Sequence, residues 1–133
     1  MILLDTDVLS MLRRPDRAPA VSAWLGRQDE GSLYISVITL GEIERGIALQ
    51  RRRDPDFARD LSDWVARTVA LFGDRLLPFG AEEARIWGRL SAEIGHTGSD
   101  LMIAATALAH NAAVATGNRR HFEPAGVRLI DPV

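Results

Sequence analysis

The sequence predicts an α/β fold, in which a central parallel sheet of about four to five strands is flanked by helices and carries a protruding helical hairpin. Short apolar runs alternate with segments whose apolar residues recur at helical spacing, a pattern typical of strand–helix–strand units with parallel strands. The composition, with 47% hydrophobic and 26% charged residues, is that of an ordinary globular domain. The stretch from Ile38 to Gly73 contains two successive helical stripes without an intervening strand, which predicts the hairpin.

Short apolar runs bounded by polar residues, glycine or proline mark the expected strands. They are residues 1–4, 33–36, 76–79, 112–116 and 127–130. Helical spacing of apolar residues marks the expected helices. They are residues 6–12, 18–28, 38–50, 57–71, 84–94 and 101–110. Ser99 and Asp100 precede the last of these helices and are expected to cap it.

Length and composition restrict the class of protein. The chain of 133 residues has the size of one domain, so a single domain over residues 1–133 is expected. No run approaches the roughly 20 apolar residues of a membrane span, and the run before Asp5 is too short for a secretory signal, so a cytoplasmic protein without membrane attachment is expected. The absence of cysteine excludes disulfides and thiolate chemistry. Because the net charge is −2, any contact with nucleic acid is expected to be local.

Side chains that suit metal binding lie at or near the ends of the expected strands. Asp5 ends the first strand and Asn118 follows the strand over residues 112–116, whereas Glu42 and Asp100 lie on helices next to strands. The reactive crevice of open α/β sheets lies beyond the carboxyl ends of the strands, so these side chains can converge if the two strands are neighbours. Clustered carboxylates repel one another unless a cation neutralises them. Mg²⁺ or Mn²⁺ prefers such oxygen ligands and can support phosphodiester cleavage.

Each of these acids also has a purely structural interpretation. Asp5 and Asp7 can cap the helix that starts beside them, since a carboxylate in a first turn is stabilised by about 0.3–1 kcal/mol. Asp100 fits the same capping role. Glu42 can pair with Arg45 on a solvated helix face, a contact worth only about 0.2–0.5 kcal/mol. No single position decides between the interpretations, and the combination at strand ends favours the metal site.

Other polar and aromatic residues are expected to be structural. The histidines have neither metal-site spacing nor an adjoining acid in sequence, so loop or helix-end positions are expected for all three. They are His96, His110 and His121. The three tryptophans fall on apolar helix faces and are expected in the core or an interface. They are Trp24, Trp64 and Trp87. The run from Arg51 to Arg53 is expected to be a solvated turn or a contact for RNA phosphates or a partner.

Four stretches, in this order along the chain, resemble the PIN-domain ribonucleases of the VapC toxin type, which belong to type II toxin–antitoxin systems. They are "LLDTDVLS", "SVITLGEIERGI", "SDLMIAATALAHNAAVATGN" and "VRLIDP". Each is a weak motif, but their ordered occurrence over essentially the whole chain is specific. The resemblance implies a parallel sheet with helices on both sides and cleavage of RNA that depends on Mg²⁺ or Mn²⁺.

The resemblance also implies roles for individual residues. It carries Asp5, Glu42 and Asp100 over as the acidic metal-site residues. The fourth position, often aspartate in the family, is Asn118 here, which offers a neutral oxygen and no charge, so a second metal ion is expected to bind more weakly. Asn118 is also an ordinary turn residue after a glycine. Where the family commonly has asparagine or serine this chain has Asp7, which is expected to restore part of the missing negative charge as a further metal-site residue.

Partners follow from the same resemblance. It implies a cognate small antitoxin, similar to VapB proteins, whose tail crosses the active-site groove, together with an RNA substrate and a homodimer. The helical hairpin, with Trp64 and its arginines, is expected to be the surface for antitoxin or RNA. One further departure concerns the position before Phe122, where family members often have a carboxylate and this chain has His121.

Two alternatives remain open from the residues. A haloacid-dehalogenase-like phosphohydrolase also has an apolar strand ending in Asp-x-Asp, with Asp5 as nucleophile and Asp7 as general acid. Such enzymes rely on a lysine, whereas all 16 basic residues of this chain are arginine. The second alternative is a catalytically degenerate PIN domain that only binds RNA or a partner, an interpretation that Asn118 and His121 support.

Overall fold

A five-stranded sheet in the order β3-β2-β1-β4-β5 forms the centre of the computed structural model, which describes residues 1–132. The strands are β1 (Ile2–Leu4), β2 (Leu33–Ser36), β3 (Leu76–Leu77), β4 (Ala113–Ala115) and β5 (Leu129–Ile130). All four pairings are parallel, so the predicted parallel sheet is confirmed. Val133, the last residue of the expected domain, lies outside the described residues.

The two central strands are buried on both faces, which explains why they read as unbroken apolar runs. Leu3 and Leu4 of β1 are each 0% exposed, and successive side chains of a strand point to opposite faces. Leu3 packs into one hydrophobic core and Leu4 into the other. Val114 and Ala115 of β4 divide between the same two cores. The chain therefore places one hydrophobic core on each side of the sheet.

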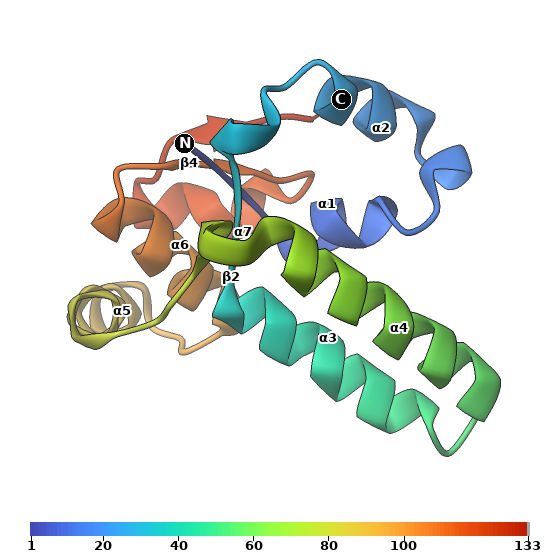
Figure 1. Ribbon diagram of the computed structural model, residues 1–133. Coiled ribbons are helices and arrows are strands. Elements are labelled where there is room, and N and C mark those ends of the chain that lie inside the picture. The colour runs from blue at the N-terminus through green and yellow to red at the C-terminus, as the bar shows by residue number, and fades with distance from the viewer. Residues whose placement is uncertain (133) are drawn as a thin grey trace.

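Helices cover both faces of the sheet (Figure 1). They are α1 (Thr6–Met11), α2 (Pro19–Gly26), α3 (Val37–Gln50), α4 (Pro55–Phe72), α5 (Ala81–Ile94), α6 (Ser99–Ala109) and α7 (Arg119–Phe122). Helices α1 to α4 supply one core, whereas α5, α6 and α7 supply the other. The tryptophans pack against these cores, as expected: Trp24 and Trp64 against the first and Trp87 against the second.

The predicted hairpin is formed by α3 and α4, which lie side by side and extend away from the sheet in Figure 1. Local chemistry explains where both helices begin. The Ser36 hydroxyl accepts a hydrogen bond of 3.0 Å from the Ile38 N–H at the start of α3. Asp54 accepts one of 3.1 Å from the Phe57 N–H at the start of α4, and Pro55 occupies the first turn, where no N–H is needed.

The expected capping of α6 is wrong. Ser99 is the first residue of the helix, Gly98 is its N-cap, and neither Ser99 nor Asp100 makes a capping hydrogen bond. The Ser99 hydroxyl donates instead to Glu42 on α3, because tertiary packing brings that carboxylate within reach. Asp100 remains in the first turn of α6.

Smaller differences concern the ends of elements. The strand expected over residues 76–79 pairs only at Leu76 and Leu77, since Pro78 has no N–H to donate to a neighbouring strand. The short helix α7 was not expected from the sequence, because its 4 residues are too few to show a periodic pattern. Among the described residues, no helix is both long enough and apolar enough to span a membrane.

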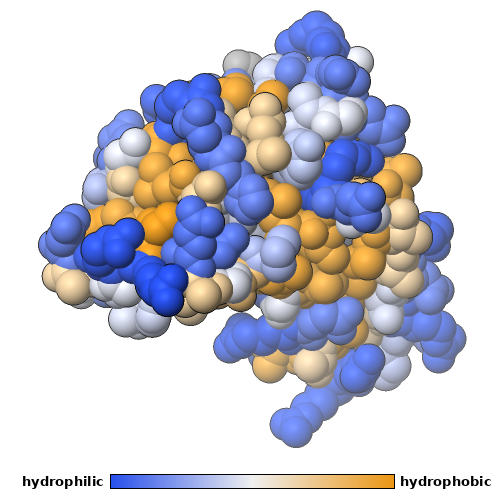
Figure 2. Space-filling model, turned by 60° about the vertical axis from the view of Figure 1, so that its left-hand side comes forward, coloured by the Kyte–Doolittle hydropathy of each residue, from blue (hydrophilic) through white to orange (hydrophobic). Residues whose placement is uncertain are grey.

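Apolar side chains reach the surface at several places. Leu49 on α3 is 55% exposed and Leu71 on α4 is 64% exposed. Figure 2 shows hydrophobic areas between the hydrophilic side chains on the face turned 60° from the view of Figure 1. Such areas are available for contact with another protein chain.

Candidate metal and catalytic site

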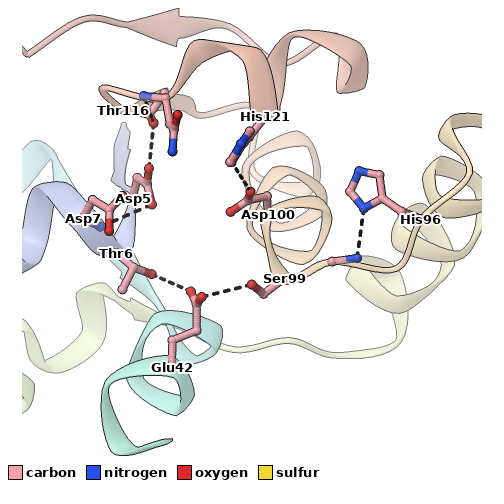
Figure 3. A network of polar contacts seen from close by, with 11 residues as sticks. Asp5, Thr6, Asp7, Glu42, His96, Ser99, Asp100, Thr116 and His121 are labelled. Carbon is pink, nitrogen blue, oxygen red and sulfur yellow. Dashed lines mark hydrogen bonds and ion pairs between the residues drawn. The ribbon is translucent and has the colours of Figure 1, made fainter. Parts of the chain in front are cut away.

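The candidate site lies beyond the carboxyl ends of β1 and β4, the two central strands between which the order of the sheet reverses. Asp5 follows β1 directly, and its N–H donates a hydrogen bond of 3.0 Å to the Ala115 carbonyl of β4. Thr116 follows β4, and its hydroxyl donates a hydrogen bond of 2.6 Å to Oδ2 of Asp5 (Figure 3). The two strands are neighbours, which is the condition under which the site residues were expected to converge, and the Thr116 hydrogen bond fixes the orientation of the Asp5 carboxylate.

Asp5 is a buried anion, with 5% of its surface exposed. Its Oδ1 accepts a weak hydrogen bond of 3.4 Å from the Asp7 N–H, so Asp5 is the N-cap of α1 as its structural interpretation proposed. Burial raises the pKa of Asp5 above 3.8, the negative charges of Asp7 and Asp100 raise it further, and the hydrogen bonds from Thr116 and Asp7 lower it in part. A cation beside Asp5 would offset both the desolvation and the repulsion.

Glu42 is held by hydroxyl groups from two other helices. Its Oε1 accepts a hydrogen bond of 2.6 Å from Thr6 on α1, and its Oε2 accepts one of 3.0 Å from Ser99 on α6. The Thr6 hydroxyl also lies 2.9 Å from the fully buried Thr39 hydroxyl. Because the one hydroxyl proton of Thr6 goes to Glu42, Thr39 must donate to Thr6. We call Thr6, Thr39 and Ser99 the hydroxyl clamp of Glu42.

The hydroxyl clamp changes the interpretation of Glu42. The sequence left open a surface ion pair between Glu42 and Arg45, and within residues 1–132 the structure shows no such pair. Both carboxylate oxygens of Glu42 accept from hydroxyl groups instead. Glu42 is therefore a positioned carboxylate that faces the strand ends, as Figure 3 shows.

Asp100 has an acid–base partner that the sequence did not reveal. Nδ1 of His121 on α7 lies 2.8 Å from Oδ2 of Asp100. His121 lies in the last turn of the short helix α7, a helix-end position as expected, and its acid partner comes from a different helix. His110 is the C-cap of α6, which is also a helix-end position, and its Nε2 lies 3.5 Å from the buried carboxylate of Glu83. His96 does lie in a loop, where its Nδ1 accepts a hydrogen bond of 3.1 Å from the Gly98 N–H.

Asn118 and Asp7 lie at the same edge of the sheet but differ in what they contribute. Asn118 is exposed and precedes α7, and its backbone N–H donates a hydrogen bond of 2.9 Å to the Thr116 hydroxyl. This bond continues to Asp5 through Thr116, so the backbone at Asn118 helps to orient Asp5. Asp7 is exposed in the first turn of α1, where its negative charge acts on Asp5.

The candidate metal ligands are carboxylate oxygens, which suit a hard divalent cation, and one of these carboxylates, Asp5, is buried. Among the described residues no three Asp, Glu or His side chains are grouped closely enough to enclose a metal ion. Mg²⁺ is usually held through one or two carboxylates and completes its coordination with water and substrate oxygens. Asp5 and Asp100, whose charges act on each other, provide such a pair.

Sequence reasoning missed the hydroxyl groups that orient the acids. Thr6 follows Asp5 directly and Thr116 ends an expected strand, so both stood beside predicted site residues. A hydroxyl next to a strand-end acid was the available signal. Thr39 and Ser99 carried no comparable signal, since their partners are 33 and 57 residues away in sequence.

The parallel sheet that carries the buried Asp5 carboxylate beyond its two central strands is shared with known proteins. A family model described as PIN domain matches residues 2–127. The chain belongs to the PIN-domain family. The resemblance found in the sequence is thereby confirmed, and the haloacid-dehalogenase alternative is overturned.

Individual relatives are similar to this chain over nearly its whole length. The chain is 37% identical to the VapC ribonuclease Y4jK of Sinorhizobium fredii, over 99% of this chain and 97% of that protein. It is 33% identical to the toxin FitB of Neisseria gonorrhoeae, over 99% of this chain and 98% of that protein. The crystal structure of FitAcB from Neisseria gonorrhoeae superposes with a TM-score of 0.86, at 33% identity over 99% of this chain and 98% of that one.

Proposed function

We propose that this protein is the toxin of a type II toxin–antitoxin system, an endoribonuclease that uses Mg²⁺ or Mn²⁺. The observation that carries the proposal is the buried Asp5 carboxylate, which faces the charges of Asp7 and Asp100 without a basic side chain bonded to it among the described residues. The names of the relatives, a VapC ribonuclease and the toxin FitB, support the same activity.

Each site residue has a proposed role. Asp5 and Asp100 hold the divalent ion, with Asp7 adding negative charge at the edge of the site. When bound, such an ion activates a water molecule and stabilises the charge that develops during phosphodiester cleavage. Glu42, fixed by the hydroxyl clamp, is positioned to orient water or to accept its proton. Asn118 offers a neutral oxygen, so a second ion is expected to bind more weakly there.

We also propose a cognate antitoxin as the protein partner. Solved structures of similar chains include FitAB bound to the IR36 DNA fragment, at 33% identity and a TM-score of 0.85, and VapBC-5 from Mycobacterium tuberculosis, described as a member of the VapBC family of toxin–antitoxin systems, at 25% identity and a TM-score of 0.59. The exposed leucines of the α3–α4 hairpin offer apolar area for such a partner or for a second copy of the chain. A homodimer is the expected form of the free toxin.

Cleavage assays on the free protein test the proposal. Purified without antitoxin, it is expected to cut structured RNA in Mg²⁺ or Mn²⁺ and to stop in chelator. Asp5→Asn and Asp100→Asn remove proposed metal ligands, and Glu42→Gln removes the proposed proton acceptor. Each is expected to lower the rate by at least about 100-fold. The matched controls Asp60→Asn and Glu93→Gln change exposed acids of α4 and α5 and should leave the rate unchanged. Cleavage that survives in chelator or in all three site variants would contradict the proposal.

A degenerate PIN domain, which binds RNA or a partner without cutting, is a second candidate. The observation that favours it is the contact of 2.8 Å between His121 and Asp100, which occupies one oxygen of a proposed metal ligand. RNA binding by the wild-type protein without cleavage in any divalent cation would establish this alternative.

A further inference from the structure

We propose that a hollow at the far end of α1 binds phosphate groups of the RNA substrate on one side of the cleavage point. This inference rests on the proposed function and adds a substrate-binding subsite to it. The hollow, about 300 Å³ in volume, is called the arginine hollow here. It is lined by Ser10, Met11, Arg13, Arg14, Arg17 and Ala18.

The arginine hollow is a strongly basic part of the surface. Three guanidinium groups line one small depression, although the chain as a whole has a net charge of −2. Arg14 and Arg17 are exposed, and no acid of the described residues forms an ion pair with either. Guanidinium groups match the geometry of phosphate oxygens and bind them through paired hydrogen bonds. A protein with negative net charge needs such a local basic site to retain a polyanion.

One wall of the hollow is held in place by an aromatic ring. The guanidinium carbon of Arg13 lies 4.9 Å from the centre of the Phe57 ring, over its face. Phe57 belongs to the first turn of α4, so Arg13 links the end of α1 to the start of that helix, where α4 follows the hairpin turn. Because the ring restrains Arg13, this side chain loses less conformational freedom when it binds a phosphate.

Helix α1 connects the hollow to the acids of the candidate site. Helix α1 begins at its cap, Asp5, and Figure 3 shows it leading away from the site. Its 6 residues rise by about 9 Å, so the hollow and the proposed metal site stand at opposite ends of one short helix. A single strand of RNA cut beside Asp5 can reach the hollow within a few nucleotides. The acids repel the phosphates that flank the metal ion, and the arginines offset that repulsion.

A binding experiment in chelator tests the hollow without turnover. The probe is a fluorescently labelled single-stranded RNA, titrated at several salt concentrations. Arg14→Gln combined with Arg17→Gln is expected to weaken binding roughly 25-fold at about 0.1 M salt and to reduce the salt slope by about 1.4, since each lost phosphate contact on a single strand contributes about 0.7. Arg14→Lys with Arg17→Lys, which keeps the charge but loses the paired geometry, should recover part of the affinity.

A matched control removes two other arginines. Arg85→Gln combined with Arg89→Gln makes the same change in net charge on the exposed face of α5 and should leave RNA binding unchanged. An equal loss in both double variants would show only general electrostatics and would overturn the inference, as would an unchanged salt slope in the first. Melting temperatures equal to wild type confirm that the variants fold. If the double variant melts early, Arg17→Gln alone is compared with Arg89→Gln.

Further measurements distinguish RNA from free phosphate and antitoxin as the ligand of the hollow. They also distinguish failure of this inference from failure of the proposed function. Inorganic phosphate should compete with RNA only weakly, and competition at equal concentration would overturn a polynucleotide subsite. Loss of antitoxin binding with RNA binding intact would assign the hollow to the antitoxin and overturn the inference. RNA binding that depends on the hollow without any cleavage supports the inference while refuting the proposed activity. Metal-dependent cleavage with RNA binding unaffected by the arginine variants refutes the inference alone.

Discussion

The Asp5 carboxylate is both buried and held in one direction by hydrogen bonds. It is almost fully buried, and its two oxygens accept hydrogen bonds from Thr116 and from the Asp7 N–H. The bonds fix its direction, whereas burial and the neighbouring acids disfavour its charge. A bound cation would stabilise the charged form of Asp5, whereas without a cation the buried charge lowers the stability of the folded protein.

Asp5→Asn is therefore expected to stabilise the metal-free protein while abolishing cleavage. The folded-state pKa of Asp5 is raised above 3.8, so between the unfolded and folded pKa values the folded state binds more protons, and stability falls as pH rises. Above the folded pKa, the full loss of folding stability caused by the charged Asp5 is present. Asparagine carries no charge and avoids this loss, and its oxygen can still accept the Thr116 hydrogen bond. Thermal melts in chelator at pH 7 should show a higher melting temperature than wild type, with the difference vanishing below the unfolded pKa.

The exposed Asp60→Asn is the control, because it removes a charge without relieving burial. A melting temperature for Asp5→Asn at or below that of wild type at pH 7 would show that Asp5 is not a destabilising anion.

His121 is expected to weaken metal binding at Asp100. Its ring nitrogen occupies one carboxylate oxygen at 2.8 Å, and the protonated form adds a positive charge beside the proposed ion. His121→Ala should tighten Mg²⁺ binding by up to about fivefold, since an exposed ion pair is worth roughly 1 kcal/mol at most. Calorimetric titration with Mg²⁺ measures the change, with His96→Ala as the control. Weaker Mg²⁺ binding in His121→Ala would mean that His121 helps to hold the site together.

At the scale of elements, the hydroxyl clamp connects three helices at Glu42. Thr6 is the first residue of α1, Thr39 lies on α3 one turn before Glu42, and Ser99 begins α6. The clamp therefore joins helices from both faces of the sheet at the candidate site. Its loss should affect stability and catalysis together.

Ser99→Ala is expected to cost about 1.5 kcal/mol of unfolding free energy, the lower end for a hydrogen bond to a charged group, and to slow cleavage. Urea unfolding measures the first effect and RNA cleavage the second. Ser91→Ala is the control, since its hydroxyl bonds only to the Gly88 carbonyl of its own helix. Adding Glu42→Gln completes a double-mutant cycle, and strictly additive effects would refute a direct coupling between Ser99 and Glu42.

For the whole molecule, the order of the strands places the acids together. The chain leaves β1 towards β2 and β3 and returns to the other side of β1 to add β4 and β5. The loops after β1 and β4 consequently leave the sheet side by side and in different directions. Asp5 and Thr116, 111 residues apart in sequence, meet there.

Mg²⁺ is expected to raise the melting temperature of the whole domain. An ion that binds only the folded state adds about 2.7 kcal/mol of stability at one hundred times its dissociation constant, which corresponds to roughly 10 °C for a chain of this size. Differential scanning calorimetry with Mg²⁺ and with chelator measures the shift. The same comparison on Asp5→Asn should show almost no shift, and a full shift in that variant would place the ion elsewhere.

Most of the fold could be predicted from local sequence patterns. The spacing of apolar residues and the glycine, proline or polar residues that bound each element are properties of neighbouring residues. The strand at residues 33–36 has the bounds expected, and α3 and α4 form the expected hairpin. The predicted capping of α6 by Ser99 was wrong because the outcome depended on a residue far away in sequence. The Ser99 hydroxyl donates its hydrogen bond to the Glu42 carboxylate on another helix instead of capping its own.

By itself, the sequence determined the parallel α/β class, the strand-end position of Asp5 and the set of acids worth testing. The tertiary structure decided which groups those acids meet: hydroxyls for Glu42, His121 for Asp100 and Thr116 for Asp5. The physical reason is distance along the chain. A helix or strand can be recognised from the pattern of a few neighbouring residues. A hydrogen bond between residues 57 or 111 positions apart forms only when the strand order has brought its partners together.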